Sequence, residues 1–290
     1  MKIVMTPNPY RDKQFKYVQE AKRILEQAGC TVRICLPFDV DKSYPLPPEL
    51  KFHDLRAEIK TAQMLICFGG DGTILHASKF ATQHHIPILG VNIGTMGFIA
   101  ELEAGELELL KKIPLGDYTL EPRTMLDVTV RSATQQLLLH ETALNDAVVT
   151  KGAIARVINI GIYCDGVEAT SFSGDGVIVC TPTGSTAYSM SAGGPIIEPA
   201  AKNLLITPIC AHAMLSRSIV TSPRRVIDVK IGKTGRHNAF LSVDGGRAFR
   251  LNTGDVVSVK ASDQLTQLVR LKDTSYFEIV NRKFIDRQRY

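Results

Sequence analysis

The pattern of apolar and polar residues changes near Pro122. Before that point, short apolar runs alternate with stretches in which apolar residues recur at helical spacing. Strands that alternate with helices favour a parallel sheet covered by helices, so we expect an α/β domain over residues 1–122. The predicted strands are Ile3–Thr6, Thr31–Leu36, Met64–Phe68 and Ile86–Asn92, and the predicted helices are Gln14–Gln27, Thr73–Gln83 and Glu101–Lys112.

Beyond Pro122 the apolar runs are short, rich in Val, Ile and Thr, and separated by turn residues. This pattern predicts a mainly β, sandwich-like domain over residues 123–269. The predicted strands are Met125–Val130, Gln136–His140, Ala155–Tyr163, Gly176–Cys180, Ser218–Thr221, Val226–Ile231, Ala239–Val243 and Val256–Lys260.

Composition narrows the class of protein. The 290 residues are 44% hydrophobic and 22% charged, which is typical of a globular chain. A net charge of +5 with scattered Lys and Arg argues against a nucleic-acid surface. No apolar run approaches the roughly 18–20 residues of a membrane span, and Pro7, Pro9 and Arg11 interrupt any export signal, so we expect a cytoplasmic protein. The six cysteines form no CxxC pair and predict buried, reduced thiols rather than zinc ligands.

A glycine-rich stretch, Gly69–Thr73, comes directly after an apolar strand and opens a predicted helix. Ligands of α/β sheets bind at the carboxyl ends of strands. Glycines let backbone N–H groups approach phosphate oxygens, and the helix N-terminus adds free donors and partial positive charge. Asp71 conflicts with an anion site unless it binds a metal ion or accepts a proton from an attacking hydroxyl. The stretch therefore predicts either phosphoryl chemistry or a turn in which Asp71 caps the helix.

The sequence Gly69-Gly-Asp-Gly-Thr73 resembles the GGDGT motif shared by NAD kinases, 6-phosphofructokinases, and diacylglycerol and sphingosine kinases. Two further stretches, Leu144-Asn-Asp-Ala147 and Gly174–Pro195, resemble signatures of the NAD kinases, the second through Gly-Asp-Gly and Thr-Pro-Thr-Gly-Ser-Thr-Ala-Tyr. By this resemblance the chain is identified as a member of the NAD kinase family. The similarity also includes Gly97-Phe98, the region of Arg156, Ile209–His212 and Ser242–Gly245.

The resemblance implies two domains with a cleft between them, a C-terminal tail (about 270–290) that completes the first domain, and a homodimer or homotetramer. It implies transfer of a phosphoryl group to the 2′-hydroxyl of the adenosine ribose of NAD, giving NADP. ATP, another nucleoside triphosphate or polyphosphate would be the donor, and a divalent metal ion, Mg²⁺ above all, would assist. NAD and ATP are then the expected partners, without nucleic acid or membrane.

The same resemblance assigns roles to individual residues. Asp71 is expected to be the general base, and Gly72 to let the nucleotide pass close to the backbone. Asn145 suits an adenine edge and Asp146 suits ribose hydroxyls, while Tyr188 can stack on an adenine ring. The remaining candidates for contacts with NAD or phosphate are His76, Phe98, Arg156, Ser173, Asp175, Thr183, Thr186, Ala187, Ser189, Met190, Ser191 and Gly245.

Several of these residues have plainer interpretations. Asn145-Asp146 is also typical of an ordinary turn, and the Ser/Thr-rich loop 183–191 of a solvated connection. His76 fits a structural role, and Arg156 fits a surface arginine that covers apolar area. Ser173 stands where several relatives carry Arg, Lys or Gln, so a cationic contact expected there is missing. Asp175 is expected at the nicotinamide end of NAD, in its own subunit or in a neighbour.

Two other functions compete with this interpretation. A lipid kinase or phosphofructokinase would use the same glycine motif but need a different acceptor pocket, such as an apolar tunnel. The hydroxyl-rich loop with its tyrosine favours a nucleotide acceptor instead. A protein that senses NAD without turning it over would have no obvious use for Asp71 beside phosphates.

Overall fold

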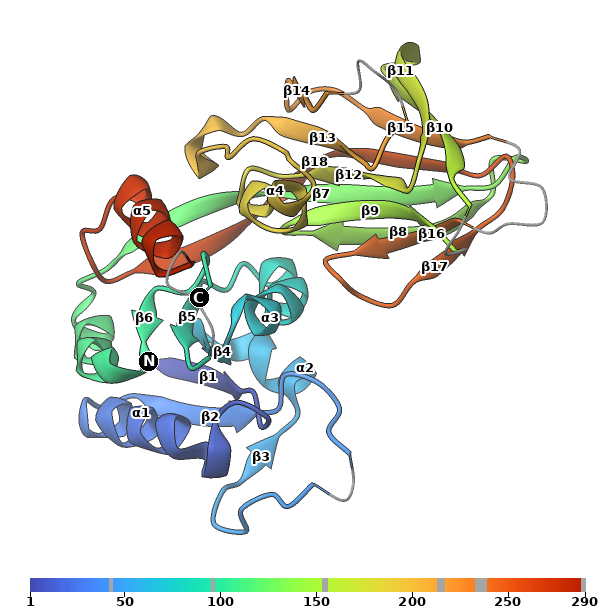
Figure 1. Ribbon diagram of the computed structural model, residues 1–290. Helices are drawn as coiled ribbons and strands as arrows, with labels where there is room; N and C mark the ends of the chain where they lie inside the picture. Colours follow the sequence, from blue (N-terminus) through green and yellow to red (C-terminus); the bar gives the residue numbers. More distant parts are fainter. Residues whose placement is uncertain (42–43, 95–96, 153–155, 213–216, 233–238, 288–290) are drawn as a thin grey trace. The chain divides into compact units, whose positions relative to one another are not determined.

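The computed structural model in Figure 1 describes residues 1–41, 44–94, 97–152, 156–212, 217–232 and 239–287. The chain forms two compact units. The first unit contains Met1–Pro122 and Leu265–Tyr290, and the second contains Arg123–Gln264. Within the described ranges, no helix has the length and hydropathy that a membrane crossing requires.

The first unit contains a parallel sheet in the order β18-β5-β4-β1-β2-β3, with β6 beside β5. β18 joins it through Leu268, which pairs with Ile88. All six residues of β4 are buried, as expected for a strand covered on both faces. The strands are β1 (Lys2–Pro7), β2 (Thr31–Cys35), β3 (Phe52–His53), β4 (Met64–Gly69), β5 (Ile88–Asn92), β6 (Leu102–Glu103) and the end of β18 (Val256–Arg270).

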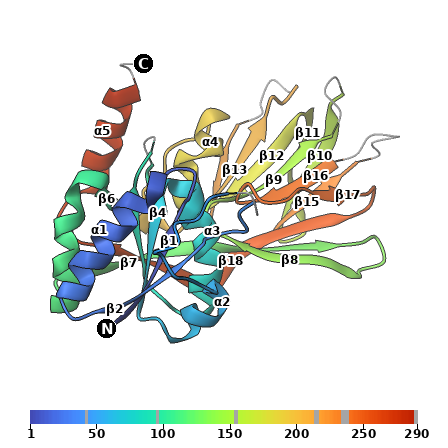
Figure 2. The ribbon, with the colours of Figure 1, turned by 90° about the horizontal axis from the view of Figure 1, so that it is seen from below.

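Helices cover both faces of this sheet. α1 (Lys16–Gln27) buries Val18, Ala21, Ile24 and Leu25 in a core shared with β1 and β4, and Gly29 (φ +81°) follows its end. α3 (Asp71–Gln83) lies on the opposite face, as Figure 2 shows. A Cβ on Gly90 of β5 would lie 2.4 Å from Ile74 of α3, so this glycine permits the close packing. The other helices are η1 (Lys13–Phe15), α2 (Leu55–Glu58), η2 (Ile59–Thr61), η3 (Ala104–Leu115) and α5 (Tyr276–Arg287).

The prediction of a helix over Glu101–Lys112 is wrong in the type of helix and in the residue at which it begins. The segment begins as strand β6 and continues as the 3₁₀ helix η3. Glu103 and Glu106 form a capping box there, which fixes the start of the helix after the strand. Glu106 has non-helical dihedrals and Pro114 lies near the end, so a regular α-helix does not develop.

The second unit consists of two β-sheets. In one, β10 pairs antiparallel with β11 and β15, β15 pairs antiparallel with β18, and β7 pairs with β18 and β8. The other is antiparallel in the order β14-β13-β12-β9-β16-β17. The strands are β7 (Thr119–Arg131), β8 (Leu137–Ala143), β9 (Asp146–Lys151), β10 (Ile158–Cys164), β11 (Val167–Gly174), β12 (Gly176–Cys180), β13 (Leu204–Ile209), β14 (Ile219–Thr221), β15 (Ile227–Ile231), β16 (Ala239–Val243) and β17 (Phe249–Leu251).

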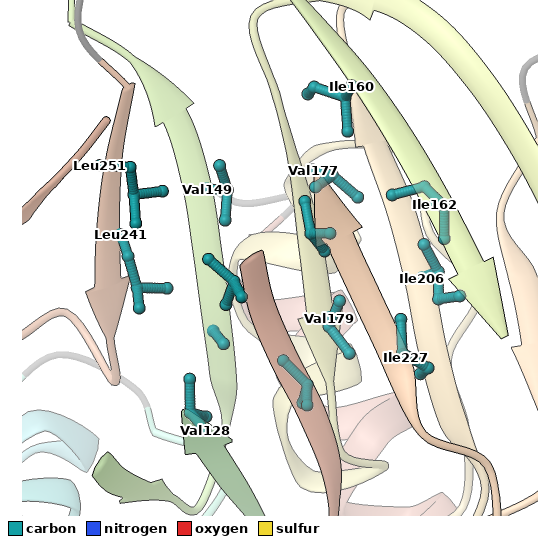
Figure 3. Close-up of a cluster of buried hydrophobic side chains, with 14 of the residues drawn as sticks. Val128, Val149, Ile160, Ile162, Val177, Val179, Ile206, Ile227, Leu241 and Leu251 are labelled. Atoms are coloured by element: carbon teal, nitrogen blue, oxygen red, sulfur yellow. The ribbon is translucent and has the colours of Figure 1, made fainter. Parts of the chain in front are cut away.

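The core of the second unit lies between these sheets. Figure 3 shows Val128, Ile162 and Ile227 of the first sheet close to side chains of the second, such as Val179 and Ile206. Such interdigitation of two inner faces is typical of a β-sandwich. The predicted fold class, an α/β part followed by a mainly β part, is therefore confirmed. Of the predicted strand Ala155–Tyr163, Ala155 lies outside the described residues.

Candidate functional site

The glycine-rich turn connects β4 to α3. A Cβ on Gly69 would lie 2.2 Å from Thr73 Oγ1, so a larger residue does not fit there. Gly70 and Gly72 instead face open space, because a Cβ on either would meet no atom within 4 Å. Their backbone is thus accessible to a ligand beside the start of α3, as the phosphate interpretation requires. The turn borders a cavity of about 190 Å³ lined by Asn8, Arg11, Phe38, Gly70, Gly72, Thr73 and Gly94.

Asp71 is the first residue of α3, and its carboxylate points to the segment that follows β5. It accepts hydrogen bonds from the backbone N–H of Phe98 (2.8 Å) and Ile99 (3.2 Å). A Cβ on Gly97 would lie 2.2 Å from Asp71 Oδ1, so this glycine makes room for the carboxylate. Burial raises the pKa of Asp71, while these amides and the charge of Lys283 oppose that rise. The two amides hold the carboxylate in one orientation. Its raised pKa makes it a stronger base than an ordinary aspartate.

Two residues of this cavity were not predicted from sequence. Asn8 and Arg11 follow β1, which pairs with β4 so that Pro7 lies opposite Phe68. Asn8 Nδ2 donates to Thr73 Oγ1 at 3.2 Å. Because parallel strands end at the same edge, polar residues after β1 were detectable as neighbours of the glycine turn. Arg11 brings a guanidinium to a cavity suited to phosphate.

His76 and Phe98 occupy different places in the first unit. His76 lies on α3 beside Phe38 and Phe80, and its Nδ1 is buried with no hydrogen-bond partner among the described residues. Burial, together with the charge of Lys79, lowers the pKa of His76, so the ring is neutral at physiological pH. Phe98 is half-buried, and its backbone amide holds Asp71. Thr95 and Met96 of the preceding loop lie outside the described residues.

In the second unit, Asn145 and Asp146 are organised by Asp244. The Asp244 carboxylate accepts the backbone N–H groups of Leu144 (2.8 Å), Asn145 (2.8 Å) and Asp146 (3.0 Å). Asp146 is 5% exposed, and burial, with the nearby charge of Asp244, raises its pKa to about 7. Asn145 is 6% exposed, and its Oδ1 has no hydrogen-bond partner in the described part of the chain. A buried amide oxygen without a partner is suited to a ligand donor.

The Ser/Thr-rich segment packs against Asn145. Thr181 donates its N–H to Asn145 O (2.9 Å), and a Cβ on Gly184 would lie 2.3 Å from that same oxygen. Two short helices follow, η4 (Thr183–Thr186) and α4 (Tyr188–Ser191). Within the second unit, the structure therefore brings together the motif Leu144–Ala147 and the Ser/Thr-rich segment that follows β12.

The side chains of this segment differ in what they offer a ligand. Ser189 is fully buried and its hydroxyl bonds to Thr207 (2.7 Å). Thr183 accepts from Arg123 (3.2 Å), and Thr186 donates to Thr183 O (3.2 Å). Tyr188 is 44% exposed, so its side chain is accessible for stacking. Of the others, Ala187 and Met190 are half-buried and Ser191 is exposed.

The remaining candidates lie elsewhere in the second unit. Asp175 forms an ion pair with Lys151 (2.6 Å), a partner that the sequence did not indicate. Ser173 donates to Asn159 Oδ1 (2.5 Å) beside a cavity of about 420 Å³. Arg156 is exposed and precedes β10 rather than lying in a strand. Gly245 (φ +67°) forms a tight turn with Asp244 and thereby aims the Asp244 carboxylate.

Two family models match this chain, one in its N-terminal part and one in its C-terminal part. Residues 3–118 match the ATP-NAD kinase N-terminal domain, and residues 144–271 match the ATP-NAD kinase C-terminal domain. The chain is 36% identical over 291 residues to the NAD kinase of Lachnoclostridium phytofermentans, with 99% of both chains covered. The chain belongs to the NAD kinase family.

Further relatives agree with this membership of the NAD kinase family. The NAD kinase of Carboxydothermus hydrogenoformans is 41% identical over 228 residues, which cover 78% of this chain and 81% of that one. The crystal structure of yeast NADH kinase complexed with NADH superposes with a TM-score of 0.84 at 26% identity, covering 97% of this chain and 86% of that chain. An NAD kinase from Archaeoglobus fulgidus in complex with ATP gives a TM-score of 0.73 at 25% identity, with 98% of both chains covered.

Proposed function

We propose that this protein is an NAD kinase that transfers the terminal phosphoryl group of ATP, or of another donor, to the 2′-hydroxyl of the adenosine ribose of NAD. The observation that carries the proposal is the position of Asp71. A carboxylate with a raised pKa is fixed by two backbone amides at the start of α3, next to a glycine turn whose backbone faces a cavity. Such a group is suited to accept a hydroxyl proton during phosphoryl transfer.

The acceptor side of the reaction is assigned to the second unit. The buried Asn145 Oδ1 is available to the exocyclic amine of adenine, and Asp146 is available to ribose hydroxyls. The exposed ring of Tyr188 is suited to stacking on adenine. Asp175, with Lys151 beside it, is assigned to the nicotinamide end. The NADH bound by the yeast relative supports NADH as a second acceptor.

The donor side is assigned to the first unit. The glycine turn and Arg11 supply backbone donors and positive charge for the triphosphate. The ATP bound by the archaeal relative supports ATP as the donor. No group of three or more His, Cys, Asp or Glu side chains in the described ranges is arranged to hold a metal ion. We assign Mg²⁺ to the phosphates of the donor, where it would neutralise charge, because binding to substrate phosphates is the usual mode of this ion.

We place the protein in the cytoplasm and expect a homodimer or homotetramer, as in the family. A lipid or sugar kinase would need another acceptor pocket, and the NAD kinase of Lachnoclostridium phytofermentans matches this chain over 99% of both chains. A sensor that binds NAD without turnover has no use for the fixed base Asp71. NADP formation by the purified protein separates these alternatives from the proposed function.

The test is to replace Asp71 by Asn and measure NADP with an NADP-specific dehydrogenase. We expect kcat to fall by roughly 10²- to 10⁴-fold, because the amide cannot accept the proton. NAD should still bind, as measured by calorimetry. Asp117→Asn is the matched control, since Asp117 is an exposed carboxylate of the same unit that pairs with Lys112. Unchanged turnover in Asp71→Asn would remove Asp71 from the mechanism.

A further inference from the structure

A second and larger cavity lies in the first unit, along α3, the helix that starts at the glycine turn. Its volume of about 720 Å³ is in the range of small-molecule sites. It is bordered by the segment after β2, by the residues from β3 to α2, and by α3. The lining residues are Leu36, Pro37, Phe38, Asp39, Val40, Phe52, His53, Asp54, Leu55, Arg56, His76 and Phe80.

A row of aromatic rings forms one wall of this cavity. Phe38 meets His76 edge to face with ring centroids 6.0 Å apart, and His76 contacts Phe80 at 5.6 Å. Tyr10, which is not a lining residue, stacks on Phe38 at 6.1 Å. The Arg56 guanidinium lies 5.7 Å from the centre of the Phe80 ring. Phe38 and Phe80 are only half-buried, so part of each ring is left for a ligand. Flat π-surfaces of this kind stack well on nucleobases.

This cavity of about 720 Å³, the aromatic cavity, neighbours the cavity of about 190 Å³ at the glycine turn, the phosphate cavity. Phe38 lines both. Thr73, His76 and Phe80 are spaced three and four residues apart on α3, which puts them on one face of the helix. The helix rises about 1.5 Å per residue, so Phe80 lies roughly 10 Å along the axis from Thr73. A triphosphate chain and a ribose cover a comparable length.

The polar groups around the cavity also suit a base. Asp39 and Asp54 are exposed carboxylates among its lining residues. They can accept hydrogen bonds from the exocyclic amine of a purine. Small-molecule sites typically combine mainly apolar walls with a few polar groups in this way. The residues assigned to NAD in the second unit are not part of this wall, which leaves the donor as the ligand.

We propose that this cavity binds the nucleobase of the phosphoryl donor, a nucleoside triphosphate, and that Phe38 and Phe80 are its stacking residues. The proposal rests on the proposed kinase function. It assigns donor recognition to two places: the glycine turn and Arg11 hold the phosphates, and the aromatic wall holds the base. A donor without a base, such as inorganic polyphosphate, would use only the first place.

The experiment compares a ligand that has a base with one that lacks it. ADP and inorganic tripolyphosphate are used as competitive inhibitors against ATP, for the wild type and for Phe80→Ala. We expect the inhibition constant of ADP and the KM for ATP to rise by roughly 5- to 100-fold, the range for loss of a base-stacking ring. The inhibition constant of tripolyphosphate and the KM for NAD should stay within about twofold of their wild-type values. Phe277→Ala is the control, because Phe277 is an exposed ring of the same unit outside the cavity.

Three outcomes would overturn the proposal: no change for ADP, an equal rise for ADP and tripolyphosphate, or a rise in the KM for NAD alone. Phe38→Ala is measured in parallel, so that a folding defect of one variant, seen as a lowered Tm, does not decide the result. If the wild type makes no NADP, the proposed function fails, and calorimetry with ADP alone tests the cavity. Binding of ADP that is lost in both Phe variants still supports a base site, whereas equal or absent binding in all proteins rules it out.

Discussion

At the scale of single residues, the neighbouring acidic side chains Asp146 and Asp244 differ in their surroundings. The Asp244 carboxylate accepts hydrogen bonds from three backbone N–H groups. Asp146 is buried next to that charge, and both effects raise its pKa, to about 7. Near neutral pH, Asp146 is therefore present in both protonation states. Its carboxyl group can then donate as well as accept a hydrogen bond.

This difference predicts how stability depends on pH. In the unfolded chain Asp146 ionises near the ordinary aspartate pKa of 3.8, but in the folded chain it ionises only near pH 7. Between these values the native state binds more protons than the unfolded state, so the free energy of unfolding falls as pH rises through this window. Asp146→Asn removes the effect. Relative to wild type, the variant should gain on the order of 2 kcal/mol in unfolding free energy between pH 5 and pH 8.

Urea unfolding at the two pH values provides this measurement. Asp263→Asn, at an exposed position of the same unit, is the control and should follow the wild type at both pH values. A constant difference between Asp146→Asn and wild type would show that Asp146 is already ionised in the folded protein at pH 5.

At the scale of elements, an ion-pair network fixes the end of β18 to the segment that leads into η3. Glu101 is 8% exposed and accepts from Arg270 (3.0 Å) and from the backbone N–H groups of Leu271 (2.9 Å) and Lys272 (2.8 Å). Arg270 also contacts Glu121 (2.5 Å). The loop before η3 therefore depends on residues that lie far away in the sequence.

Removal of the arginine should destabilise the first unit. Arg270→Ala leaves Glu101 buried with only its backbone partners, and loss of one member of a buried pair costs about 3–5 kcal/mol. Because two amides remain, we expect the lower end of this range, measured by urea unfolding. Arg282→Ala, at an exposed position on α5, should change stability by less than about 0.5 kcal/mol. Equal effects of the two variants would contradict a structural role for the network.

The strength of the apolar pattern in each element decides whether that element could be predicted from the sequence. β4 and α1 have strong apolar patterns, and their predicted bounds agree with the structure to within three residues. β11 is a polar, largely exposed edge strand, and β13 contains Pro208, which argues against a strand. β9 starts at Asp146, in a sequence typical of a turn, and β17 has three residues. The fold class was predictable because it depends on the many clear elements rather than on these.

The candidate site residues likewise divide into those that a local pattern reveals and those that it does not. Asp71 stands out because a carboxylate among glycines conflicts with a plain anion site, and that conflict is visible in the sequence itself. Asp244 acts on Asn145 because β16 pairs with β9, about a hundred residues away in sequence. Arg11 reaches the glycine turn because β1 pairs with β4. Such roles depend on long-range pairing, which local patterns do not reveal.

At the scale of the whole molecule, the chain enters the second unit once and returns to the first. The second unit is continuous in sequence, Arg123–Gln264, and has its own core between two sheets. The first unit is discontinuous. Its core includes Val269 and Leu271, and Leu268 pairs with β5. Without residues 265–290, β5 would lose a neighbouring strand and the buried Glu101 would lose its partners.

This asymmetry predicts different behaviour of fragments. The fragment 123–264 should fold alone, because its core is complete, and show dispersed amide resonances and a cooperative thermal transition. The fragment 1–122 should not, because it lacks two buried core residues and exposes the edge of β5. Joining residues 1–122 to 265–290 through a short Gly/Ser linker should restore cooperative unfolding, since loop closure over such a linker costs little. If fragment 1–122 unfolds at the same temperature as the linked form, the returning segment adds nothing to the first unit and the assignment of residues 265–290 to its core is wrong.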